Sequence, residues 1–200
     1  MDLHEILYTI ATAISVTVIT LSSSFFQKWH RKRQRHKSYL AHKETQEQIV
    51  ALYDIMNECI NTTEADRFYI FQSHNGSGLP HIGKPYKVSA LFGPNLYKDT
   101  KRDFQNIVVD QAYTKILKSI IETEGCYKFV TAEEPDSLLK RIYLMEGVNL
   151  SRIYYIAALE TGMVYCSIST KEGLDSFSEA DLARIEVAIA KIKSIYSSTF

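Results

Sequence analysis

Hydrophobic residues follow three different patterns along this chain of 200 residues. The first pattern is a run from Ile6 to Phe26 in which apolar residues alternate with Thr and Ser, and which contains neither a charged residue nor a proline. A helix of this length, at ~1.5 Å per residue, spans the ~30 Å hydrocarbon core of a bilayer. We therefore expect one transmembrane helix here. The alternative is a buried or interfacial helix, but an interfacial helix normally carries charge on one face.

Basic residues follow this run at once. They are Lys28, Arg31, Lys32, Arg33, Arg35 and Lys37. The positive-inside rule then places the N-terminus outside and the remainder of the chain in the cytoplasm, with the basic residues against lipid headgroups. A cleaved signal peptide would begin with basic residues, whereas this chain begins with Asp2 and Glu5. We expect a single-pass protein of the inner or plasma membrane.

The second pattern, apolar residues at three- and four-residue spacing, predicts helices. The predicted ranges are Ser38 to Asn61, Ile107 to Glu124, about Pro135 to Met145, and a last helix that opens with Phe177, Ser178 and Asp181. Ser178 is a typical N-cap, and Phe177 and Leu182 have the spacing of a hydrophobic staple.

The third pattern consists of short β-branched and aromatic segments, which predict strands. These are Arg67 to Ser73, Tyr86 to Phe92, Tyr127 to Thr131, Arg152 to Leu159 and Met163 to Ser169. A Glu160-Thr161-Gly162 turn favours an antiparallel hairpin between the last two. The predicted fold class is α+β, an antiparallel sheet with helices on its faces, preceded by one transmembrane helix. We divide the chain into an anchor at 1–27, a basic juxtamembrane segment at 28–43 and a folded domain at 44–200.

Charge and cysteine content narrow the possible functions. The formal net charge is zero, but the segment from Lys28 to Lys43 contains seven Lys/Arg residues and no acidic residue, so the remaining domain is mildly acidic. An acidic domain attracts nucleic acid poorly, and we expect no nucleic-acid partner. The three cysteines, Cys59, Cys126 and Cys166, are too widely spaced for a CxxC pair and favour reduced thiols.

The order of elements, with RIYYIAALETGMVYCSIS followed by FSEADLARIEVAIAKI, resembles a GAF domain between about Ser38 and Tyr196. The segment FQSHNGSGLP is also similar to uncharacterised phage and bacterial proteins of GAF-like type. The resemblance implies that the first and last helices pack together and form a homodimer, through Ile49 to Ile60 and Leu182 to Tyr196. It also implies a small-molecule pocket on the other face of the sheet. The residue set of cyclic-nucleotide-binding members is not recognisable, and no Cys-His pair is present to attach a bilin.

Residues with reactive side chains give no catalytic motif. The glycines around Asn75 to Gly78 lack the Gly-Lys-Ser/Thr of a phosphate loop, and His74 and His81 lack a nearby Cys or carboxylate to complete a metal site. No GxSxG or HExxH is present. We expect neither an enzyme, nor a cofactor, nor a metal. The candidate ligand-binding residues are Ser73, His74, Asn75, Lys87 and Ser89.

The leading functional hypothesis is a membrane-tethered, non-enzymatic sensor or binding module for a small ligand or a protein partner. The alternative is a phage-type membrane-active or structural protein in which the α/β domain acts as regulator or scaffold.

Overall fold

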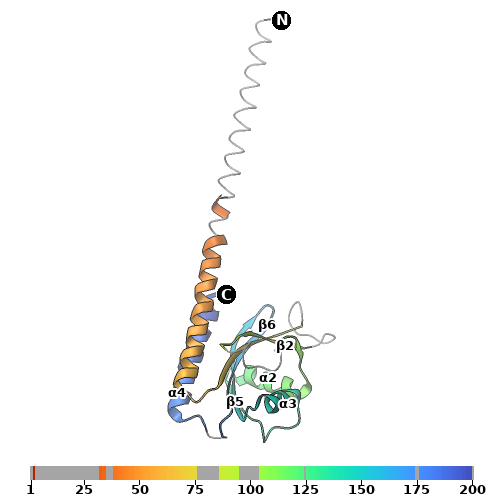
Figure 1. The fold of residues 1–200 in the computed structure, drawn as a ribbon. Coiled ribbons are helices and arrows are strands. Elements are labelled where there is room, and N and C mark those ends of the chain that lie inside the picture. The colour runs from red at the N-terminus through yellow and green to blue at the C-terminus, as the bar shows by residue number, and fades with distance from the viewer. Residues whose placement is uncertain are drawn as a thin grey trace. The chain divides into compact units, whose positions relative to one another are not determined.

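The computed structural model describes residues 2, 32–34, 38–75, 86–94, 104–123, 125–173 and 176–199 (Figure 1). The predicted transmembrane helix at Ile6 to Phe26 lies outside these residues, as does most of the loop that follows His74. Within the described ranges, no helix combines the length and the apolar character needed to cross a membrane. The chain divides between Ile49 and Val50 into two units, which are described separately below.

The first unit is helical at residues 32–34 and 38–49. Lys32 and Arg33 are exposed, and the other four basic residues of the predicted headgroup contact lie outside the described residues. Tyr39 and Leu40 are also exposed, and Lys43 and Glu47 form an exposed ion pair one turn apart. Such pairs stabilise a helix only slightly.

The second unit contains a six-stranded antiparallel sheet with the strand order β3-β2-β1-β6-β5-β4. Its strands are β1 (Arg67–His74), β2 (Lys87–Phe92), β3 (Ile107–Val108), β4 (Cys126–Val130), β5 (Leu150–Leu159) and β6 (Gly162–Thr170). The predicted hairpin between β5 and β6 is confirmed. Strand β6 also pairs with β1, which brings together residues that are between 92 positions (Gln72 and Val164) and 102 positions (Arg67 and Ser169) apart in the sequence.

Helices cover both faces of this sheet, and each face has its own hydrophobic core. Helices α2 (Gln111–Thr123) and α3 (Leu138–Glu146) lie on one face, and α4 (Glu179–Thr199) lies on the other (Figure 1). Leu52 and Met56, from a helix at residues 50–62, share the core beneath α4. Alternation along β6 separates the two cores, because Tyr165 faces α2 and α3 while Cys166 faces α4.

Two predicted helix starts are wrong. Ile107 and Val108 form strand β3, and α2 begins only after Asp110, whose Oδ1 accepts the N–H of Tyr113 at 2.8 Å. Pro135 precedes α3 and is not part of it, because Ser137 is the N-cap and its Oγ accepts the N–H of Lys140. Both errors have one cause: a side-chain cap sets the first residue of a helix, and apolar spacing does not locate the cap.

Candidate functional site

Three of the five predicted ligand-binding residues lie together where β1 and β2 pair. His74 is opposite Lys87 in the register of the two strands. The Nε2 of His74 lies 2.8 Å from the Oγ of Ser89, which also accepts the backbone N–H of Asn106 at 2.9 Å. Burial and the charge of Lys87 lower the pKa of His74, so its imidazole is neutral at pH 7.

Ser73 points to the opposite face from His74, because side chains alternate along a strand. It is 1% exposed, and its Oγ accepts the N–H of Met163 at 3.0 Å and donates to the carbonyl of the same residue at 3.3 Å. Ser73 therefore joins β1 to β6. Asn75, the last described residue after β1, is partly buried. The five residues do not converge on one pocket among the described residues.

The face of the sheet under α2 and α3 is filled by aromatic side chains. The rings of Phe71 and Tyr165 stack at 5.4 Å between centroids, and Phe104 packs against Phe71 at 6.1 Å. The hydroxyls of Tyr113 and Tyr165 lie 2.6 Å apart, and burial raises the pKa of both phenols. These rings belong to the hydrophobic core on this face of the sheet.

A buried ion pair on the same face was not predicted. Nη1 of Arg67, at the start of β1, lies 3.1 Å from Oε2 of Glu146, at the end of α3, and both side chains are almost completely buried. The guanidinium also donates to the carbonyl oxygen of Glu146 at 3.2 Å. No local pattern could have indicated this pair, because its members are 79 positions apart.

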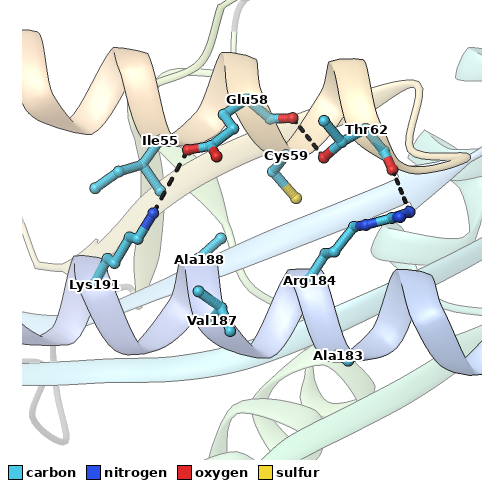
Figure 2. A pocket seen from close by; sticks show the side chains of 9 residues that line it. All are labelled: Ile55, Glu58, Cys59, Thr62, Ala183, Arg184, Val187, Ala188 and Lys191. Atoms are coloured by element: carbon cyan, nitrogen blue, oxygen red, sulfur yellow. Dashed lines mark hydrogen bonds and ion pairs between the residues drawn. The ribbon is translucent and has the colours of Figure 1, made fainter.

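A groove lies between the helix at 50–62 and α4 (Figure 2). It is on the opposite face of the sheet from Phe71 and Tyr165. Its volume is about 320 Å³. The lining residues are Ile55, Glu58, Cys59, Thr62, Ala183, Arg184, Val187, Ala188 and Lys191. Cys59 and Ala188 are buried, whereas Val187 is 55% exposed. We call this feature the helix groove.

Polar contacts join the two helices along the helix groove. Lys191 Nζ lies 3.5 Å from Glu58 Oε2, and Nη1 of Arg184 donates to the carbonyl oxygen of Thr62 at 2.8 Å (Figure 2). Burial raises the pKa of the Cys59 thiol to about 11. The thiol is therefore protonated at neutral pH and is a poor nucleophile. The helix groove has the features of a contact surface: small and apolar side chains flanked by charges of both signs.

All lining residues of the helix groove except Thr62 fall within the two segments that sequence analysis predicts as dimer helices. The sequence does not single out its individual residues. Val187 is one of several apolar residues of α4, and only the packing shows that it faces outward while Ile185 and Ile189 are buried.

Comparison with known proteins shows similarity in structure but not in sequence. No family model matches the chain, and no curated protein matches it. The GAF domain of a two-component sensor histidine kinase from Bacillus halodurans matches with a TM-score of 0.51 at 14% identity, covering 73% of this chain and 93% of that domain. A GAF domain/HD domain protein from Geobacter sulfurreducens matches with a TM-score of 0.55 at 10% identity, covering 76% of this chain and 92% of the other.

A third solved structure, of the cyanobacteriochrome receptor PixJ, matches with a TM-score of 0.53 at 6% identity and covers 76% of this chain. Identities this low show a shared fold and leave ligand and activity open. The α+β part of the predicted fold class is thus confirmed, and the chain has the fold of GAF domains.

Proposed function

We propose that this chain is a non-enzymatic, GAF-fold sensor or binding module, tethered to a membrane by residues 6–26 and acting in the cytoplasm as a homodimer through the helix groove. The single observation that carries the homodimer is the exposed Val187, which lies on a hollow lined by small and apolar side chains. Exposed apolar side chains beside a hollow favour association, because burying them removes apolar surface from water.

A second copy of the chain suits the helix groove for a reason of symmetry. In a twofold interface the same patch faces itself, so a protruding side chain must find a hollow in an identical surface. The helix groove offers both, with Val187 as the protrusion and the space above Cys59 and Ala183 as the hollow. It also carries the acid Glu58 with the bases Arg184 and Lys191, which allows opposite charges to meet across the twofold axis.

The environments of the cysteines support a non-enzymatic role. Burial raises the pKa of the Cys59 and Cys166 thiols, which disfavours the thiolate that a cysteine nucleophile needs.

Cysteine cross-linking in membranes tests the homodimer. We expect Val187→Cys, in a chain that also carries Cys126→Ser, to form a disulfide-linked dimer under mild oxidation, because the two copies of residue 187 would lie near the twofold axis. The measurement is the fraction of dimer on a non-reducing gel. Cys126 is replaced because it is the exposed native thiol among the described residues.

The matched control is Glu186→Cys in the same background. Glu186 is also exposed on α4 but does not line the helix groove. Equal cross-linking at the two positions, or none at residue 187, would contradict a dimer formed through this groove.

A further inference from the structure

A second hollow, of about 350 Å³, lies between the start of α2 and the segment that joins β4 to α3. Its lining residues are Gln111, Ala112, Lys115, Ile116, Tyr127, Glu134, Pro135 and Ser137. We call it the α2–β4 cleft. Its volume is at the lower end of the range for small-molecule sites, ~300–1,000 Å³.

Hydrogen bonds hold the two walls of the α2–β4 cleft in place. Asp110 joins the first turns of both helices: its Oδ1 accepts the N–H of Tyr113 in α2, and its Oδ2 accepts the N–H of Leu138 in α3 at 2.6 Å. The opposite wall is fixed by the N–H of Glu134, which donates to the carbonyl of Val130 at 3.1 Å, and by the ammonium of Lys140, which donates to the carbonyl of Glu134. A site with fixed walls loses little entropy when it binds a ligand.

Opposite charges lie on these two walls. Lys115 extends from α2 and forms neither an ion pair nor a hydrogen bond with any residue that the structure describes. Across the cleft, Oε1 of Glu134 accepts the hydroxyl of Tyr127 at 2.9 Å, and its Oε2 accepts no hydrogen bond from the residues that the structure describes. The cleft therefore presents a free cation on one side and an oriented carboxylate oxygen on the other.

The phenol of Tyr127 keeps this carboxylate in position over the physiological pH range. Burial, together with the hydrogen bond and negative charge of Glu134, raises the pKa of Tyr127 to about 12. Its hydroxyl consequently remains a donor at neutral pH.

The floor between the two charges is apolar. Ile116 is buried beneath the cleft, and Ala112, Pro135 and the ring of Tyr127 surround it. The carboxylate of Glu134 would repel an anionic ligand, and the ammonium of Lys115 would repel a cationic one. An uncharged ligand would cover both charges without pairing either.

We infer that the α2–β4 cleft binds a small zwitterion of the amino-acid class, with its carboxylate on Lys115, its ammonium group on Glu134 and an apolar side chain against Ile116 and Pro135. This inference rests on the proposed function, because it names the ligand class of the proposed binding module.

Binding is tested on the full chain in nanodiscs, with each of the twenty free L-amino acids as the probe, by thermal shift and then by calorimetry. We expect at least one amino acid with an apolar side chain to bind. Its N-acetyl and amide derivatives, which lack the ammonium or the carboxylate, should bind at least about tenfold more weakly. We also expect Lys115→Met and Glu134→Gln each to weaken binding at least about tenfold, because each leaves one charge of the ligand unpaired.

Two neighbouring residues provide matched controls. Lys118 is on α2, like Lys115, but it pairs with Glu122 and does not line the cleft; Glu133 is next to Glu134 and does not line the cleft either. Lys118→Met and Glu133→Gln should leave the affinity within about twofold, since neither contacts the ligand.

Three results would overturn the inference: no binding of any amino acid, equal binding of the derivatives, or affinity unaffected by Lys115→Met and Glu134→Gln. The cross-linking of Val187→Cys, measured on the same preparations, separates the two proposals. A cross-linked dimer that binds no zwitterion refutes the ligand and leaves the proposed association standing.

Discussion

At the scale of single residues, Gly162, the first residue of β6, has no room for a side chain. A Cβ at this position would lie 1.6 Å from the backbone oxygen of Ser73, and the φ angle of 150° is one that residues with a side chain rarely adopt. The absent side chain lets β6 come close enough for Ser73 Oγ to bond both backbone groups of Met163. Sequence analysis assigned Gly162 to a turn and could not have found this contact.

Gly162→Ala should therefore destabilise the domain strongly. Backbone strain alone costs about 1–3 kcal/mol, and the contact with Ser73 adds to it. We expect the melting temperature to fall by more than about 4 °C. Gly173→Ala is the matched control, because a Cβ there has no atom within 4 Å. A Gly162→Ala protein as stable as this control would show that β1 and β6 are not packed as described.

At the scale of elements, α4 is the helix that its sequence predicts best. The N–H of Asp181 donates to Ser178 Oγ at 3.1 Å, and the N–H of Ser178 donates to Asp181 Oδ2 at 3.0 Å, which confirms the predicted cap. Caps of this kind act within four residues, so the local sequence contains all the information they need. The predicted starts of α2 and α3 were wrong because apolar spacing does not locate their caps, Asp110 and Ser137. Asp110 in addition accepts the N–H of Leu138, from 28 positions away.

Loss of the α4 cap gives a prediction at this scale. Ser178→Ala should lower the free energy of unfolding by about 1 kcal/mol, because it leaves the N–H of Asp181 without its acceptor. Denaturant titration of the detergent-solubilised chain measures the change. Ser194→Ala, at an exposed position within the same helix, should change stability by less than about 0.5 kcal/mol. Equal effects of the two substitutions would argue against the cap.

At the scale of the whole molecule, the proposed membrane anchor determines where the GAF-fold domain acts. The full chain should fractionate with membranes and resist alkaline carbonate, whereas a chain without residues 1–37 should remain in the soluble fraction. The physical reason is that twenty-one uncharged residues suffice to span the bilayer. Recovery of the full chain in the soluble fraction would contradict the anchor. Digestion of the domain by protease added to intact cells would contradict the cytoplasmic orientation.

The sequence by itself determined the features that depend on neighbouring residues. The sequence was sufficient to identify the uncharged run and its basic flank, the cap of α4, the β5–β6 hairpin and the α+β class. Local spacing and capping chemistry encode each of these features. Only the tertiary structure decided the strand order, the inward side chain of Ser73, the Arg67–Glu146 pair and the two walls of the α2–β4 cleft. These features join residues that are far apart in the sequence. They depend on which surfaces pack together, and periodicity within one segment does not specify its partner.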